Sequence, residues 1–407
     1  MQQVRKLFGN TTETLLLISL LYTAAVMPFQ KQQVPVWPGI VLMVAVWLFS
    51  GNLKNKVQLF FSNGNAVICA ALYLFYCCGY FYSSNTAYAQ TDLLLKIPLL
   101  LFPLVISSSS LKVKKDFILK TFLIAAFVSA VVCVIRAAYL TNTTDENYFY
   151  YYKLSWFFHV GHYAMYLVFA AFVALYLFFK KEKNSIRILY IFAFLFLTVV
   201  VFLLSARAQI ISYFAVITCG AILYLFTNGK RVKGILILFL LLITAVVSLY
   251  FIPATRQRFK TTQIELNQFL NNKNAESYSS YLRLAVWQTG VEVIREHPLS
   301  GVGTGDAKDE LIKKAQLKNY DIIVKRNLNY HNQFMQTWAA IGLPGLFALV
   351  FSIILAITVS LKRKQHLATV FYIIIIISFF TESMLERQAG VIFYSFFSAI
   401  LIFADNE

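Results

Sequence analysis

The chain has 407 residues, of which 59% are hydrophobic and only 13% are charged, whereas a water-soluble domain carries about 25% charged residues. This composition excludes a soluble fold and indicates that most of the chain lies in a membrane. The net charge of +18 would suggest a nucleic-acid partner in a soluble protein, but here the basic residues are placed in short connections between apolar runs. We therefore expect membrane lipids around this protein, and no nucleic acid as a partner.

Apolar runs long enough to cross a membrane recur along the whole sequence. A helix needs about 17 to 25 apolar residues to cross the hydrocarbon core. We predict about twelve such helices, at residues 14–30, 36–50, 66–82, 92–107, 117–140, 160–179, 186–204, 208–226, 234–252, 332–360, 367–382 and 389–404. The runs are too long and too evenly apolar for barrel strands, so the predicted fold class is all-α.

Basic residues cluster in every second connection between these runs, for example at Lys54, Lys180 and Lys362. Because basic connections stay on the cytoplasmic side of a membrane, this alternation predicts that both termini are cytoplasmic. The first run, Thr14 to Phe29, has no cleavage site behind it and is predicted to be a retained helix. The same alternation places the connection between the ninth and tenth helices in the periplasm.

That connection is long and polar enough to form a domain. Within it, Ser280 to Glu296 and Asp306 to Leu317 have the spacing of amphipathic helices. His297-Pro298 ends the first of them, and the run Gly301 to Gly305 predicts a tight turn. We predict three parts of the chain, namely transmembrane helices 1 to 9 in residues 1–252, a periplasmic loop domain in residues 253–330, and transmembrane helices 10 to 12 in residues 331–407.

Three charged or ionisable residues are expected at the outer face of the membrane, namely Arg207, Arg283 and His331. Arg207 lies in so short a hairpin that its charge must sit at the interface, where a charge is costly unless it is paired or used. Each residue also has a structural interpretation. An interfacial arginine can reach the headgroups, an arginine on a loop helix is commonly solvated, and a single histidine is commonly only hydrogen-bonded.

The residues around His331 resemble the O-antigen ligase and polymerase superfamily. The run His331-Asn332-Gln333-Phe334-Met335-Gln336-Thr337-Trp338, followed by Ile341 to Leu346, is similar to the family signature HNxxLxxxxxxGxxGL. The topology is similar as well, because the family has about twelve spans and a large periplasmic loop before the last helices.

The loop and one hairpin carry further similarity to the same family. Arg283 with Trp287, then Pro298-Leu299 and Gly301 to Gly305, is similar to its R…W…PLxGxGxG segment. Ser205-Ala206-Arg207 is similar to its SRG or SRT hairpin, with Ala206 standing between the serine and the arginine. In residues, the resemblance is specific mainly from 280 to 346.

This resemblance implies a glycosyltransferase of the inner membrane, most closely an O-antigen ligase of lipopolysaccharide biosynthesis. Such an enzyme moves a glycan from undecaprenyl pyrophosphate to an acceptor sugar hydroxyl of lipid A-core on the periplasmic side, with inversion at the anomeric carbon. His331 would be the general base, and Arg207 and Arg283 would bind the leaving pyrophosphate, a role that suits guanidinium groups.

We expect neither a metal nor another cofactor. Carboxylates that hold Mg²⁺ are common in phosphate-handling enzymes. Here Asp306, Asp309 and Glu310 fit better as charges at the start of a helix, and the loop has an excess of basic over acidic residues.

Further residues are predicted to contact the substrates, namely Asn332, Trp287, Gly303, Gly305, His162 and Arg136. Gly303 and Gly305 could offer backbone N–H groups to phosphate, although a plain turn is the stronger alternative. Lys96 and Arg136 lie inside predicted spans, where they could serve the substrates or pair with charges of the last outer hairpin, which holds Glu382, Glu386 and Arg387. The roles of Lys96, His159 and Glu382 stay open.

Other functions stay open too. An O-antigen or exopolysaccharide polymerase uses the same carrier with a different acceptor, and a related ligase acts on protein hydroxyls. A flippase or transporter for a lipid-linked sugar would also fit about twelve spans. The long outer loop with Arg283 and His331 favours an enzyme, because alternating access does not require such a loop.

Overall fold

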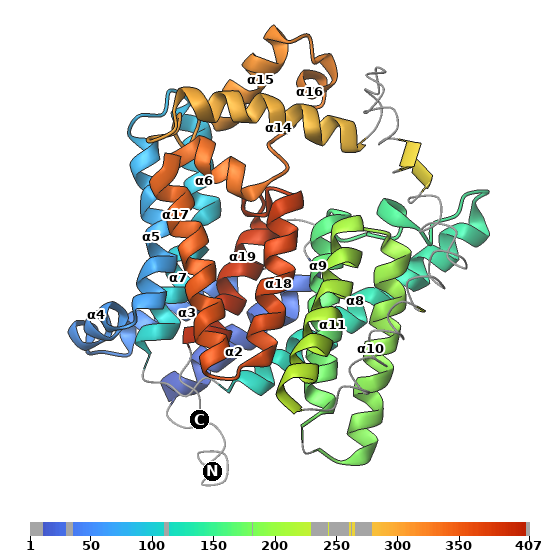
Figure 1. Cartoon of the computed structure of the whole chain (residues 1–407). Coiled ribbons are helices and arrows are strands. Elements are labelled where there is room, and N and C mark those ends of the chain that lie inside the picture. Colours follow the sequence, from blue (N-terminus) through green and yellow to red (C-terminus); the bar gives the residue numbers. More distant parts are fainter. Residues whose placement is uncertain are drawn as a thin grey trace. The chain divides into compact units, whose positions relative to one another are not determined.

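Figure 1 shows the computed structural model of the chain, which describes residues 11–29, 36–109, 114–180, 182–228, 243, 260–261, 263–264 and 279–403. All regular elements within these ranges are helical, which confirms the predicted all-α fold class. In chain order they are α2 (Thr11–Val26), η1 (Met27–Phe29), α3 (Trp37–Phe49), α4 (Leu53–Ser62), α5 (Gly64–Tyr80), α6 (Thr86–Lys96), α7 (Pro98–Ser108), α8 (Lys115–Thr143), η2 (Tyr151–Lys153), α9 (Val160–Phe178), α10 (Asn184–Leu204), α11 (Arg207–Asn228), α14 (Ser279–Glu296), α15 (Ala307–Leu317), α16 (Asp321–Lys325), α17 (Gln333–Lys362), α18 (His366–Thr381), η3 (Met384–Glu386), α19 (Gln388–Ser398) and η4 (Ala399–Phe403).

The observed helices occupy the predicted membrane spans, except that the span predicted at 234–252 lies outside the described residues apart from residue 243. Among the described residues, 6 helices are long and apolar enough to cross a membrane, or up to 7 if the pair α3 and α4 forms one bent span. Shorter apolar helices lie at Gly64–Tyr80, Arg207–Ile222, His366–Thr381 and Gln388–Phe403. The chain is therefore a polytopic helical membrane protein.

The basic connection after α3 folds into a helix that the sequence pattern does not predict. Helix α4 turns away from α3 by 114°. The turn occurs at Gly51 and Asn52, whose φ angles of 76° and 53° lie in the left-handed region that glycine and asparagine tolerate best. Lys54 and Lys56 thus lie on a helix rather than in a loop.

The chain divides into two compact units. Unit 1 contains Met1–Ala125, Val286–Tyr372 and Glu382–Glu407, and unit 2 contains Ala126–Ala285 and Ile373–Thr381. The predicted division into transmembrane helices in 1–252 and 331–407 and a periplasmic loop domain in 253–330 depends on the side of the membrane on which each part lies. It stays a prediction.

Unit 1 is built on the packing of α5 against α17 and α7, with α19 also against α7 (Figure 1). Its core contains buried aromatic side chains that meet edge to face. The ring centroids of Phe102 and Phe396 are 5.3 Å apart, and those of Phe122 and Phe397 are 4.7 Å apart. Such edge-to-face pairs stabilise a core beyond the area they bury. The turn that precedes α19 therefore leads into a firmly packed helix.

Unit 2 is centred on α9, whose residues are buried along most of its length. Helices α10 and α11 pack against it (Figure 1). Tyr213 of α11 lies between the rings of Phe172 and Phe202, at centroid distances of 5.4 and 5.7 Å. This packing holds α11, the helix that begins at Arg207.

Candidate functional site

His331 lies where the loop that contains α14, α15 and α16 leads into α17. Its φ of 46° is in the left-handed region, which is uncommon for residues other than glycine. The His331 N–H donates to Oδ1 of Asn329 at 3.1 Å. Asn332 is the N-cap of α17, and its Oδ1 accepts from the N–H of Met335 at 3.1 Å, as capping asparagines commonly do. The backbone of His331 is therefore held from both sides.

The imidazole of His331 contacts a carboxylate. Its Nδ1 lies 2.9 Å from Oε1 of Glu382, and the two side chains are 24% and 14% exposed. Because a carboxylate only accepts hydrogen bonds, this contact favours the tautomer with the proton on Nδ1. Nε2 then carries the lone pair, which is the state that a general base needs.

A fully buried lysine holds the turn that bears Glu382. The Nζ atom of Lys96 pairs with Oε1 of Glu386 at 2.9 Å and also with Oδ1 of Asp92, and its side chain is 0% exposed. The same Nζ lies 4.6 Å from the ring centroid of Tyr76. Of the two alternatives for Lys96, the structure thus shows pairing with the last outer hairpin.

Gln333, in the first turn of α17, joins this turn to the helix. Its Oε1 accepts from the N–H of Leu385 at 2.7 Å, and its Nε2 donates to Oγ1 of Thr337 at 3.0 Å. Thr337 in turn lies 3.1 Å from the hydroxyl of Tyr76. The turn after α18, α17 and α5 are therefore linked by side-chain hydrogen bonds beneath His331.

Trp287 is hydrogen-bonded to Tyr330, the residue that precedes His331. Its Nε1–H donates to the carbonyl of Tyr330 at 3.0 Å, and the hydroxyl of Tyr330 donates to the carbonyl of Ala307 at 3.0 Å. Tyr330 is fully buried, and this burial raises its pKa well above the usual value. A Cβ on Gly290 would lie 2.8 Å from the Tyr330 ring, so the glycine allows the close approach.

The glycine-rich turn packs against a break in α17. The N–H of Gly303 donates to the carbonyl of Ala340 at 3.0 Å, and that of Leu343 donates to the carbonyl of Pro298 at 3.1 Å. These bonds use backbone groups that an unbroken helix would use internally. Helix α17 is non-helical at Ile341 and Gly342, where Gly342 has a φ of 67°. The glycine-rich turn and the glycine motif of α17 are thus joined by backbone hydrogen bonds.

The N–H groups of the two glycines predicted to bind substrate are engaged within the protein. That of Gly303 donates to Ala340 as described, and that of Gly305 donates to Oγ of Ser83 at 3.0 Å. A Cβ on Gly305 would lie 2.2 Å from the carbonyl oxygen of Asn85. This geometry favours the plain-turn alternative over a phosphate site.

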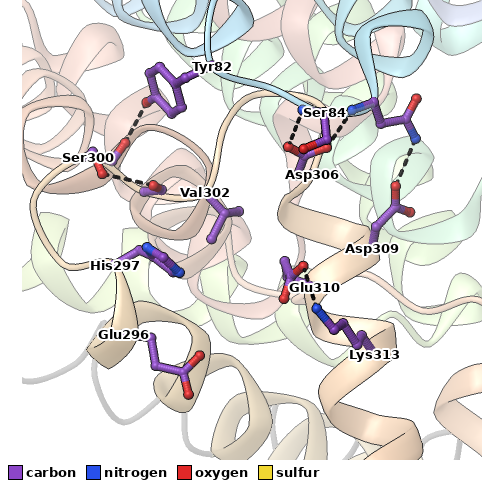
Figure 2. Close-up of a pocket in the computed structure, with 12 residues that line it drawn as sticks. Tyr82, Ser84, Glu296, His297, Ser300, Val302, Asp306, Asp309, Glu310 and Lys313 are labelled. Atoms are coloured by element: carbon purple, nitrogen blue, oxygen red, sulfur yellow. Dashed lines mark hydrogen bonds and ion pairs between the residues drawn. The ribbon is translucent and has the colours of Figure 1, made fainter.

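A cavity of about 810 Å³ lies beside this turn (Figure 2). The carboxylate of Asp306 accepts from the N–H groups of Ser84 and Asn85 at 2.6 and 2.7 Å, and Asp309 accepts from Nδ2 of Asn85 at 2.8 Å. The acidic start of α15 therefore fastens the loop to the connection between α5 and α6. The residues that line the cavity are Tyr82, Ser84, Asn85, Glu296, His297, Ser300, Gly301, Val302, Asp306, Asp309, Glu310 and Lys313.

Unit 2 carries both predicted catalytic arginines. Helix α10 ends at Leu204, its C-cap Ser205 has a φ of 48°, and Arg207 begins α11. The hairpin between α10 and α11 is as short as predicted, and Arg207 belongs to the first turn of a helix. Arg283 lies on α14, where its side chain is half-buried.

The two other predicted contact residues of unit 2 lie among aromatic side chains. Arg136 of α8 donates to the carbonyl of Lys153 at 3.2 Å, and its guanidinium lies 5.5 Å from the ring centroid of Trp156. His162 of α9 is 1% exposed, and its ring centroid is 5.8 Å from that of His159. The contacts described for Arg136 thus lie within its own unit.

The structure brings part of the predicted site together. Asn332 and His331 are adjacent, and Trp287 reaches them through Tyr330, all within unit 1. The approach of Arg207 and Arg283 to His331 stays a prediction. Sequence reasoning did not assign Glu382 a role, although its place at the outer end of a predicted span was visible in the sequence.

Comparisons with known proteins agree with the signature residues. Residues 192–350 match the family model described as O-antigen ligase. An uncharacterized protein of Haemophilus influenzae is 30% identical over 251 residues, which cover 58% of this chain and 60% of that relative. The match thus spans about 60% of the relative's own length. Residues 192–350, which contain Arg207, Arg283 and His331, are therefore similar to the O-antigen ligase family.

Proposed function

We propose that this protein is a periplasm-facing glycosyltransferase of the bacterial inner membrane that ligates O-antigen to lipid A-core. Its donor is the glycan on undecaprenyl pyrophosphate. The observation that carries the proposal is the contact of His331, which lies within the matched residues, with Glu382, because this contact favours the tautomer of a base. In this proposal both termini are cytoplasmic and His331 lies on the periplasmic side.

The reaction needs one proton transfer and one displacement. The acceptor hydroxyl gives its proton to Nε2 of His331 as its oxygen attacks the anomeric carbon of the donor sugar. The new bond joins that oxygen to the anomeric carbon. The bond from the same carbon to the pyrophosphate oxygen breaks, and its electron pair leaves with the lipid pyrophosphate. Attack from the face opposite the leaving group inverts the linkage.

The arginines would stabilise the leaving group. A lipid pyrophosphate carries about two negative charges, and guanidinium groups bind such oxygens in pairs. Arg207 stands in the first turn of α11, where the positive end of the helix dipole also favours an anion. Arg283 precedes Trp287 by four residues on α14, so the two side chains share one face of that helix.

A polymerase is the second candidate, because the same base and arginines would serve it. The acceptor distinguishes the two functions. A ligase transfers to lipid A-core, whereas a polymerase extends a glycan that is itself attached to the lipid carrier.

The test uses purified protein in lipid nanodiscs with lipid-linked glycan and purified lipid A-core. We expect His331→Ala to abolish the release of undecaprenyl pyrophosphate and the formation of glycan-bearing lipid A-core. The control is His366→Ala, an exposed histidine at the start of α18, which should react like the wild type. Normal transfer by His331→Ala would refute the proposal, and extension of the carrier-linked glycan instead of lipid A-core would identify a polymerase.

A further inference from the structure

We propose that Glu382 is a positioning residue for His331, and that Lys96 holds Glu382 in place through Glu386. This inference rests on the proposed function, in which His331 takes a proton from the acceptor. It assigns roles to a carboxylate and a buried lysine that lie outside the signature motifs. The two residues act on the reaction through the histidine.

The geometry at Nδ1 suits an orienting carboxylate. The 2.9 Å contact between Nδ1 and Oε1 fixes both the ring orientation and the tautomer. As Nε2 takes a proton the ring becomes a cation, and the carboxylate stabilises that charge. The contact therefore contributes most in the transition state, where stabilisation raises kcat.

The backbone of His331 shows that the ring position is held firmly. A non-glycine residue in the left-handed region costs about 1 kcal/mol or more, and such conformations persist only where the surroundings enforce them. Here Asn329 and the cap of α17 hold the backbone, while Glu382 holds the side chain.

The turn that carries Glu382 is anchored at its far end. The N–H of Met384 donates to the carbonyl of Glu382 at 2.9 Å, and the N–H of Leu385 donates to Gln333 at 2.7 Å. Glu386 then pairs with Lys96 at 2.9 Å in a site closed to solvent. Separating a buried pair leaves a charge uncompensated, which opposes movement of the turn.

The kinetics of Glu382 variants distinguish a positioning role of Glu382 from a purely structural one. We expect Glu382→Ala to lower kcat by roughly 10- to 100-fold, as loss of an orienting partner commonly does. KM for the lipid-linked glycan should change by less than about twofold, because Glu382 does not bind the donor. Glu382→Gln keeps an acceptor oxygen without the charge, so its loss should be smaller. Glu292→Gln, which alters a loop carboxylate paired with Lys318, should match the wild type.

A spectroscopic readout tests the same contact without activity. The chain has five histidines, so nitrogen NMR of protein with labelled histidine can be assigned with His331→Ala. We expect the Nδ1-protonated tautomer of His331 in the wild type and in Glu382→Gln, and a mixture of tautomers in Glu382→Ala. If Glu382→Ala does not fold, the kcat of Glu382→Gln and the wild-type tautomer still decide.

The outcomes distinguish the two proposals. If His331→Ala loses transfer while Glu382→Ala keeps the wild-type kcat, the positioning role is refuted and the enzyme assignment stands. If His331→Ala transfers normally, the enzyme assignment is refuted, whatever tautomer the ring adopts. A wild-type His331 with its proton on Nε2 would also refute the positioning role.

Discussion

Two hydrogen bonds orient His331. The ring meets a carboxylate at Nδ1, and the preceding carbonyl of Tyr330 meets the indole N–H of Trp287. Both contacts orient the histidine. The indole contact gives Trp287 a second interpretation beside the predicted one of contacting the substrate.

Trp287→Phe separates these interpretations. The phenyl ring keeps an aromatic face but loses the N–H donor, which leaves the carbonyl of the buried Tyr330 without that hydrogen bond. Loss of such a partner costs about 1 to 3 kcal/mol. We expect a lower melting temperature and a lower kcat, with KM for donor and acceptor nearly unchanged. A large rise in KM at an unchanged melting temperature would instead indicate that Trp287 contacts the substrate.

At the scale of elements, the break in α17 joins the loop to the membrane helices. A Cβ on Gly342 would lie 2.0 Å from the carbonyl oxygen of Leu299, and a Cβ on Gly301 would lie 2.6 Å from the backbone of Ala340. Both glycines also have positive φ angles. Glycine is therefore required at both positions for close backbone approach and for conformation.

Strain at this backbone conformation alone costs about 1 to 3 kcal/mol. Because a backbone clash adds to this strain, Gly342→Ala should destabilise the protein by more than the strain alone. The matched control is Gly64→Ala at the start of α5, where an added Cβ would meet nothing within 4 Å. Thermal unfolding in detergent measures the difference. Equal melting temperatures for the two variants would contradict the described packing of the loop on α17.

The sequence pattern identifies elements better than their breaks. Apolar runs and amphipathic spacing locate the spans and the helices α14 and α15, because both signals are local. The break at Gly342 and the turn into α4 depend on contacts or backbone angles that hydropathy does not encode. For the same reason the ion pair of Lys96 with Glu386 appears in the sequence only as one of several pairings.

At the scale of the whole molecule, the family signature and the structure support different parts of the account. In the proposed function the signature residues carry the chemistry, and the structure shows how unit 1 holds His331, Glu382 and the loop together. The remaining link is the approach of Arg207 and Arg283 of unit 2 to the donor, which the sequence motifs alone support. Electrostatic stabilisation of the leaving pyrophosphate requires that approach.

That link is tested most directly by a cryo-EM structure of the His331→Ala variant in nanodiscs with the lipid-linked glycan bound. The variant holds the donor without consuming it. The account predicts the pyrophosphate between the guanidinium groups of Arg207 and Arg283, with the anomeric carbon facing position 331. A pyrophosphate that contacts neither arginine would contradict the account. An anomeric carbon that faces away from position 331 would also contradict it.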